Sequence, residues 1–205
     1  MVSTASKALP KSFHHGNLRQ SLLEAAMVQE DIANLSLRQL AAGLGVSAAA
    51  VYRHFADRDD LLAEVARIGF ERLEKQFEDA FDMTCPPADA PEATFRLRRL
   101  AEAYLGFADT EPALWRLIFS AQAEPFRGIT PPEGCGGSYQ YLPAALLGLH
   151  QTGIIPTQPN ERDALFAWSA IHGAATLRAG LVPGALMPLT ELATEVAERV
   201  IKSLK

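Results

Sequence analysis

Side chains that can donate hydrogen bonds to phosphates and base edges gather between residues 36 and 58 of the 205-residue chain. A hydroxyl, a guanidinium and an imidazole follow one another at Tyr52, Arg53 and His54. Such donors contact the backbone and grooves of DNA, and alanine methyls can contact the thymine methyl group. The sequence therefore predicts a DNA-binding surface made of Ser36, Arg38, Ser47, Ala48, Ala50, Tyr52, His54 and Arg58.

The segment from residue 36 to residue 55 has the pattern of two short helices joined by a tight turn. Ser36 with Gln39 three residues later is a capping box that begins the first helix. Gly45 can adopt the left-handed backbone that ends this helix, Val46 is placed to turn inward, and Ser47 can cap the second helix. The segment is therefore predicted to be a helix-turn-helix that inserts its second helix into the major groove.

A second group of side chains, mostly aromatic, lies in the later part of the chain. Trp168 and His172 are four residues apart and share one helical face, with Gly173 beside them. Two interpretations of this group are open: its side chains pack in the hydrophobic core, or they line a pocket. The two are compatible. As ligand-binding residues for a hydrophobic or aromatic effector we predict Tyr104, Phe107, Trp115, Phe119, Trp168 and His172, with Phe166 in the same cavity.

No catalytic, cofactor or metal motif occurs in the sequence. It has no nucleophile elbow, P-loop, dinucleotide fingerprint or His-Glu-x-x-His, so no enzyme activity, cofactor or metal is expected. Cys85 and Cys135 lack CxxC spacing and are read as loop thiols, with redox sensing as the alternative. The adjacent His14 and His15 are poor chelators alone, which favours an arm near DNA over a metal site.

Helical periodicity extends nearly throughout the chain, and no run of alternating β-branched residues predicts a strand. Asp57 can cap a long helix that reaches Phe81 and is able to bridge two domains. Further helices are expected after the Pro-rich connector 84–91, from Pro112, and at about 138–152, 160–180 and 189–204. We predict an all-α fold with a three-helix helix-turn-helix domain at 1–58 and a helical effector-binding and dimerisation domain at 59–205.

Charge is divided unevenly along the chain, whose net charge is −5. Residues 1–58 carry six Lys or Arg against four Asp or Glu, whereas the remainder is acidic. A mildly basic end on an acidic body fits DNA contact by one end only. Apolar stretches are too short to span a bilayer and no secretory signal is visible, so a cytoplasmic protein without a membrane partner is expected.

Small and apolar residues in the last two predicted helices suggest an interface between two copies of the chain. A two-fold, four-helix interface would place two DNA-binding ends on successive major grooves, about 34–36 Å apart or a multiple of that. The residues predicted to build it are Ala164, Ala167, Ala170, Gly173, Ala174, Leu192, Val196, Val200 and Leu204.

The region from His14 to Leu62 resembles the DNA-binding domain of the tetracycline-repressor (TetR) family. The resemblance rests on Ala41, Gly45-Val46-Ser47, Tyr52-Arg53-His54-Phe55 and Leu61-Leu62. The later part resembles, more diffusely, the branch named for a Trp-His-Gly signature, here Trp168, His172 and Gly173. The resemblance implies a homodimeric repressor that a small-molecule effector releases from double-stranded operator DNA. A ligand-independent dimeric DNA-binding protein is the alternative.

Two departures from the family pattern concern the DNA-binding region. The connection at 30–34 is short and lacks the glycine often found there, and the second helix begins with three alanines. Few hydrogen bonds to bases are therefore available, and recognition through methyl contacts, Ser47 and DNA shape is expected.

Overall fold

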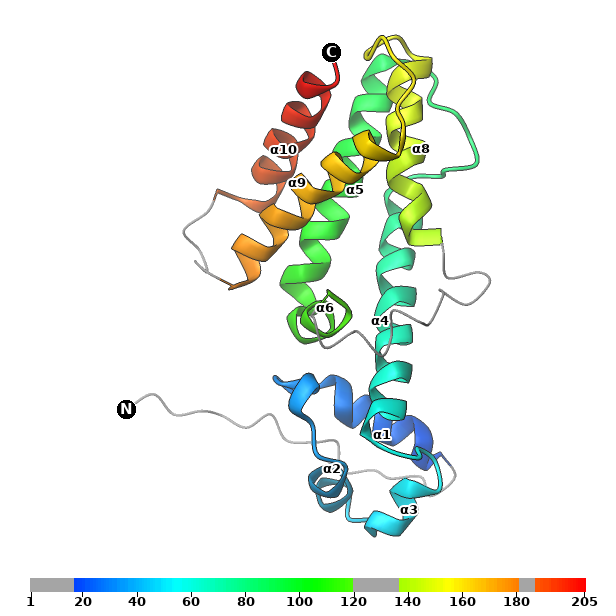
Figure 1. Ribbon diagram of the computed structural model, residues 1–205, viewed down its shortest axis with the longest axis vertical. Coiled ribbons are helices and arrows are strands. Elements are labelled where there is room, and N and C mark those ends of the chain that lie inside the picture. Colours follow the sequence, from blue (N-terminus) through cyan, green and yellow to red (C-terminus); the bar gives the residue numbers. More distant parts are fainter. Residues whose placement is uncertain (1–16, 120–136, 181–186) are drawn as a thin grey trace.

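A computed structural model of the chain describes residues 17–119, 137–180 and 187–205. Within these ranges the regular elements are all helical, which confirms the predicted all-α fold. Figure 1 shows a small lobe, the head, joined to a larger lobe, the body, by one long helix. The head contains α1 (Leu18–Met27), the 3₁₀ helix η1 (Ile32–Asn34), α2 (Leu37–Gly43) and α3 (Ala48–Tyr52), and the long helix is α4 (Arg58–Ala80). The body contains α5 (Ala90–Thr110), α6 (Pro112–Phe119), α8 (Gly137–Gln151), α9 (Glu161–Gly180) and α10 (Leu189–Ser203).

The head has a small apolar core between α1, α2, α3 and the start of α4. Leu22 of α1, Leu40 of α2 and Val51 of α3 are at most 6% exposed, so each of these helices contributes to one contiguous core. Arg19 of α1 closes one side, because its guanidinium lies 5.3 Å above the Phe55 ring and 3.2 Å from a carboxylate oxygen of Glu64 in α4. The core and this ion pair together fix α4 to the head.

The long helix α4 begins at a reciprocal cap and connects the two lobes. Asp57 accepts a hydrogen bond from Asp60 N at 2.9 Å, and the Asp60 carboxylate accepts one from Ala56 N at 2.9 Å. The 23 residues of α4 span about 35 Å at 1.5 Å per residue. Leu61 is buried at its beginning and Phe77 near its end, so one helix contributes to the cores of both lobes.

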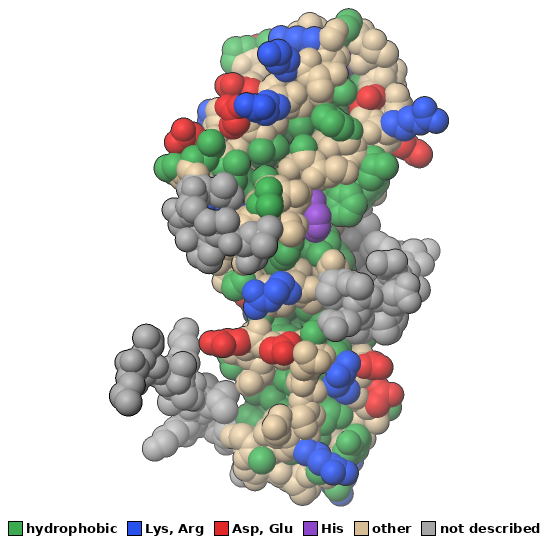
Figure 2. Space-filling view, turned by 60° about the vertical axis from the view of Figure 1, so that its left-hand side comes forward, with side chains coloured by type: hydrophobic (Ala, Val, Ile, Leu, Met, Phe, Trp, Pro, Cys, Tyr) green, Lys and Arg blue, Asp and Glu red, His purple; other side chains and the backbone are tan. Residues whose placement is uncertain are grey.

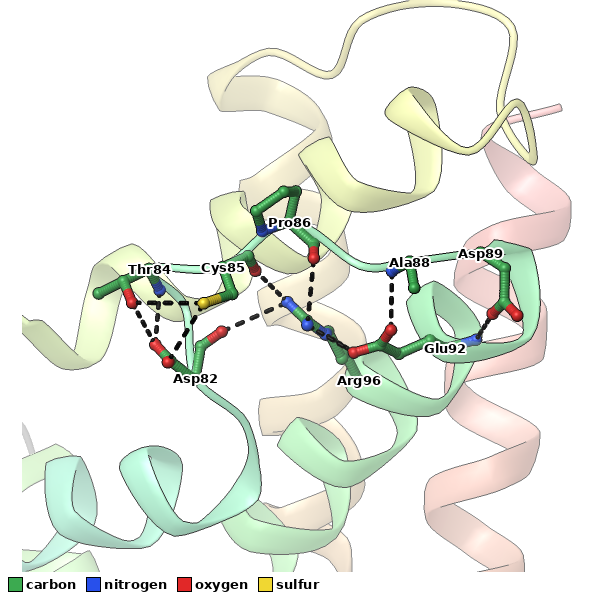
Figure 3. Close-up of polar contacts among 8 residues, drawn as sticks. All are labelled: Asp82, Thr84, Cys85, Pro86, Ala88, Asp89, Glu92 and Arg96. Atoms are coloured by element: carbon green, nitrogen blue, oxygen red, sulfur yellow. Dashed lines mark hydrogen bonds and ion pairs between the residues drawn. The ribbon is translucent and has the colours of Figure 1, made fainter.

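The connector between α4 and α5 is held by Arg96, the one charged side chain among the described residues that is buried. Figure 3 shows its guanidinium reaching the backbone of the connector and the carboxylate of Glu92. Arg96 donates to the carbonyl oxygens of Asp82, Cys85 and Pro86 at 3.3, 2.5 and 3.4 Å, and Nη2 lies 2.5 Å from Glu92 Oε1. The hydrogen bond from Ala88 N, followed by Arg96, lowers the pKa of the Glu92 carboxyl.

In the body, α5 packs against α4, α8, α9 and α10. The predicted apolar face of α5 is buried, as Leu97, Leu100, Ala101, Tyr104 and Ala108 are at most 5% exposed. The helices predicted around 112, 138–152, 160–180 and 189–204 are all present, with limits that differ by about one residue. Part of the interface predicted on α9 and α10 is buried in the chain's own core.

The small residues of α9 pack mainly within the chain. Ala164 and Ala167 are 4% and 0% exposed, and Val200 of α10 is 1% exposed. The prediction that these three residues meet a second copy is therefore wrong, because α9 uses its small side chains to lie close to its own body. Gly173, by contrast, has open space where a Cβ would stand.

Among the described residues, none of the helices is long and apolar enough to cross a membrane.

Candidate nucleic-acid interface and effector site

The helix-turn-helix is built as the sequence predicts. Ser36 Oγ accepts a hydrogen bond from Gln39 N at 3.5 Å at the start of α2. At the other end of α2, Gly45 has a φ of +67°, and Val46 N donates to Ala41 O at 3.0 Å. This left-handed glycine reverses the chain within a few residues. Val46 then packs against the head core, so the turn is anchored at both sides.

The second helix of the motif, α3, exposes its polar side chains. Ser47 Oγ accepts a hydrogen bond from Ala50 N at 3.2 Å and so caps α3. Val51 is buried while Tyr52 is 48% exposed, which orients the helix with one face against the head and the other outward. Figure 1 places α3 at the end of the molecule farthest from the body. This is the position required of a helix that enters a groove of DNA.

The residues predicted to contact DNA fall into an exposed group and a partly buried group. Arg38, Ser47, Tyr52, His54 and Arg58 are exposed, and Ser36, Ala48 and Ala50 are partly buried. Arg58 stands at the start of α4, where its Nε lies 3.4 Å from Asp59 Oδ1, so its charge is partly offset. His14, His15 and Cys135 lie outside the described residues, and Cys85 is an exposed free thiol in the α4–α5 connector.

The short connection between α1 and α2 is formed by η1. Asp31 caps it by accepting a hydrogen bond from Asn34 N at 3.3 Å, and Ile32 is 2% exposed. A capped 3₁₀ turn with one buried anchor replaces the glycine often found at this connection. Arg116 of α6 donates to Glu30 O at 3.0 Å, so this connection also contacts the body.

Five of the six residues predicted to bind a ligand come together in the body. We call Tyr104, Trp115, Phe119, Trp168 and His172 the aromatic cluster. His172 is at its centre, with ring centroids 5.2 Å from Trp115, 5.1 Å from Phe119 and 5.3 Å from Trp168. The Trp115 and His172 rings are stacked at an interplanar angle of 25°. The cluster therefore joins α5, α6 and α9.

A hydrogen bond between Tyr104 and His172 gives the aromatic cluster a polar centre. Tyr104 Oη lies 2.7 Å from His172 Nδ1. Burial raises the pKa of Tyr104 well above its ordinary value, with the nearby indole groups of Trp168 and Trp115 opposing the shift, and burial lowers the pKa of His172. A protonated phenol therefore faces a neutral imidazole. Nε1 of Trp115 is buried and has no hydrogen-bond partner among the described residues.

Two predicted residues lie outside the aromatic cluster and one unpredicted residue contacts it. Phe107 is fully buried in the body. Phe166 is 50% exposed on the outer side of α9, so it does not line the cavity, contrary to the prediction. Phe77 of α4 stacks on Tyr104 with centroids 6.2 Å apart. Its place in the periodic apolar face of α4 predicts burial and gives no signal of this ring contact.

A cleft of about 360 Å³ opens between the head and the aromatic cluster. Figure 2 shows the indented waist between the two lobes, where charged side chains of both signs lie. The cleft, which we call the junction cleft, is lined by Glu30, Asp31, Ile32, Ala33 and Asn34 of the head and by Ala113, Trp115, Arg116, Leu117, Phe119, His172 and Thr176 of the body. A larger hollow of about 760 Å³ between α5 and α10 contains none of the predicted site residues.

Both lobes match known families of regulators. Residues 22–65 match the sequence model of the bacterial regulatory proteins of the tetR family, and residues 97–204 match that of the tetracyclin repressor-like C-terminal domain. HTH-type transcriptional regulator Rv1816 of Mycobacterium tuberculosis is 29% identical over 111 residues, which are 54% of this chain and 45% of that protein. The chain thus matches less than half the length of this curated relative.

Solved structures share the fold along nearly the whole chain. A protein of unknown function from Rhodococcus sp. RHA1 is 32% identical, with a TM-score of 0.69 and coverage of 95% of this chain and 99% of that one. LfrR from Mycobacterium smegmatis, solved with proflavine, is 21% identical, with a TM-score of 0.54 and coverage of 91% and 93%.

The family matches to the helix-turn-helix head and the helical body define the class as DNA-binding transcriptional regulators. Because one family model matches more than half of the chain and a second matches the head, the chain belongs to the tetracycline-repressor (TetR) family. The matches do not single out the Trp-His-Gly branch.

Proposed function

We propose that the chain is a homodimeric repressor that a small, hydrophobic or aromatic effector releases from its operator. The observation that carries this proposal is the aromatic cluster, which lies in the body and contacts α4 through Phe77 and Tyr104. Because α4 also belongs to the head core, a ligand that favours one arrangement of the rings would favour one position of the head. In this proposal residues 1–58 bind DNA and residues 59–205 bind the effector and the second subunit.

The proposed DNA interface is the exposed side of α3 with its flanking residues. Arg38 and Tyr52 would contact phosphates, and Ala48 and Ala50 would contact thymine methyl groups. With a duplex selected from a random-sequence library by the protein itself, Arg38→Ala should weaken binding about tenfold and reduce the salt dependence by about one ion. Tyr52→Phe should weaken binding without changing the salt slope.

Replacing thymine by uracil tests the methyl contacts, because only the methyl group is lost. We expect weaker binding at one or more positions of the selected duplex. Unchanged affinity at every thymine would reject the methyl-contact part of the proposal, while the Arg38 and Tyr52 variants test the rest independently.

A ligand-independent dimeric regulator is the second candidate. It is favoured by the mutual ring contacts of the aromatic cluster, in which Phe119 lies 5.6 Å from Trp115, 6.5 Å from Trp168 and 5.1 Å from His172 between ring centroids. The neighbour LfrR, by contrast, was solved with proflavine, which favours a ligand-responsive body. Screening aromatic compounds for release of the selected duplex separates the two, and bound compounds should perturb the fluorescence of Trp115 and Trp168. Compounds that perturb fluorescence but never change DNA affinity would support the ligand-independent alternative.

A further inference from the structure

The junction cleft differs from an interior pocket of the body, because one of its walls belongs to the head. Residues 30–34, which include η1, form that wall, and α6 and α9 form the other. Its volume of about 360 Å³ lies within the range of about 300–1,000 Å³ that is usual for small-molecule sites. A molecule bound in this cleft contacts both lobes at once.

The body wall of the cleft combines flat rings with a hydrogen-bond donor. Trp115, Phe119 and His172 supply aromatic surface, which favours a flat aromatic ligand. His172 Nδ1 is the described hydrogen-bond partner of the Tyr104 hydroxyl at 2.7 Å, and because a buried O–H needs an acceptor, we assign Nδ1 as the acceptor. The hydrogen of the neutral imidazole is then on Nε2, which makes His172 a donor toward a ligand.

Trp115 gives the cleft aromatic surface but keeps its indole N–H inside the aromatic cluster. Trp115 is 6% exposed, its ring is stacked on that of His172, and its Nε1 makes no hydrogen bond with the described residues. Because this nitrogen is shielded and lies near the Tyr104 hydroxyl, it does not face the cleft, and His172 Nε2 is the donor that a ligand oxygen in the cleft can meet.

Charge around the cleft disfavours an ionised ligand. Glu30 and Asp31 oppose Arg116, which leaves a negative balance that repels an anion. At the inner end, the burial that lowers the pKa of His172 also disfavours a cation. These two conditions leave an uncharged acceptor as the matching chemistry.

We propose that the junction cleft binds an uncharged, flat aromatic compound that carries a carbonyl oxygen, and that this compound contacts the head and the body simultaneously. The carbonyl accepts from His172 Nε2, and the ring lies between the aromatic wall and residues 31–33. Such a ligand acts on the head directly, as a second connection besides α4. It stabilises the arrangement in which Arg116 donates a hydrogen bond to Glu30 O. The effect on DNA rests on the proposed function, whereas binding itself does not.

The test uses the full chain and three two-ring compounds of matched shape, with affinity measured by calorimetry. They are 2-acetonaphthone, which has the carbonyl, 2-isopropenylnaphthalene, which lacks the acceptor, and 2-naphthoate, which is charged. The ketone should bind at least tenfold more tightly than either of the others. Failure of the ketone to bind, or equal affinity for all three compounds, would overturn the assignment of the ligand class.

A head variant tests the shared wall. Ala33→Phe fills the cleft from the head side, and Ala88→Phe makes the same change at an exposed position of the α4–α5 connector. Ala33→Phe should weaken ketone binding at least tenfold, with the unliganded protein still helical by circular dichroism and still binding the selected duplex, and Ala88→Phe should not weaken it. Wild-type ketone affinity in Ala33→Phe would overturn head contact.

Parallel measurement of duplex affinity separates this proposal from the proposed function. If the ketone binds in the cleft but leaves duplex affinity unchanged, the cleft assignment is supported and effector-controlled release fails. If the ketone weakens duplex binding equally in wild type and Ala33→Phe, the shared-wall proposal is overturned and effector-controlled release is supported.

Discussion

Arg96 is the single side chain whose loss should most affect the junction of α4 and α5. Its guanidinium satisfies three backbone carbonyls of the connector and lies 5.5 Å from the centre of the Phe81 ring. Arg96→Met keeps the length of the side chain but leaves these acceptors without their donor. We expect the free energy of unfolding in urea to fall by about 2–4 kcal/mol.

Arg99→Met is the matched control for Arg96, because Arg99 lies on the same helix with its side chain 43% exposed and paired with Glu102. Its loss should cost about 1 kcal/mol or less. Equal destabilisation by the two variants would show that the Arg96 network contributes no more than a surface ion pair.

His172 should make stability depend on pH. Burial lowers its pKa from 6.5 in the folded protein, so the unfolded chain takes up the proton first as the pH falls. Above pH 6.5 both states are neutral and the group contributes nothing, and stability is lost progressively as the pH falls below that value. Tyr104, which contacts His172, stays protonated throughout this range, because burial raises its pKa.

His172→Asn retains an acceptor for Tyr104 but removes the titration. Urea unfolding between pH 7.5 and 5.5 should show a smaller loss of stability for this variant than for the wild type. Parallel pH profiles for the two proteins would contradict a buried, neutral imidazole.

The place of a single residue was predictable where its spacing from other residues along a helix indicates a shared face. Trp168 and His172 share a helical face, and this spacing correctly placed both rings in one cluster. The contact of Arg96 with the connector had no such signal, because its partners there are backbone carbonyls, which any residue type supplies, and its pairing with Glu92 four residues earlier indicates only a helix-surface ion pair. Phe166 was misplaced because neighbouring positions on a helix differ by 100° in direction, and a cluster of aromatic letters does not resolve that difference.

Among the elements, the turn between α2 and α3 depends most on one backbone conformation. Gly45 has a φ of +67°, and nothing lies within 4 Å of the place where its Cβ would stand. Gly45→Ala should therefore lower stability by about 1 kcal/mol through the backbone alone. Gly43, exposed at the end of α2, is the control, because alanine is favoured within a helix and Gly43→Ala should be neutral or stabilising.

Thermal unfolding of both variants measures this difference, and DNA affinity gives a second readout. Gly45→Ala should also weaken binding to the selected duplex, because this turn sets the direction of α3. Equal melting temperatures for the two alanine variants would show that the turn tolerates a side chain.

The sequence predicted the helices well because caps and prolines occur where they begin. Ser36, Ser47, Asp57 and Asp89 cap four helices, and the first three were predicted from residue type. The connection at 30–34 was harder, since a short segment without glycine predicts no particular geometry. Its 3₁₀ turn depends on Ile32 reaching the core, which is a property of the tertiary structure.

For the whole molecule, the outer face of α9 determines the expected mode of assembly. Leu165, Phe166 and Leu177 are 55%, 50% and 50% exposed on one side of that helix, and Gly173 beside them leaves open space. The small residues predicted to form the interface are partly used within the chain, so this larger apolar face is the better candidate for contact with a second copy.

We expect Phe166→Glu combined with Leu177→Glu to yield a monomer by light scattering at micromolar concentration and moderate salt. A charge on each side of a two-fold interface is repelled by its own symmetry mate. Val28→Glu, at a position of the head that is 64% exposed, should leave the mass unchanged.

Loss of the dimer should reduce affinity for the selected duplex by a factor of about 10² or more, because each head then binds its half-site without the effective concentration that its partner provides. In the proposed dimer both heads reach grooves about 34–36 Å apart, or a multiple of that, so the spacing of half-sites in the selected DNA tests the same geometry. A double variant that remains dimeric would place the interface elsewhere. A monomeric variant with wild-type affinity would instead show that one head is sufficient for recognition, and control of head spacing could then no longer explain effector-driven release.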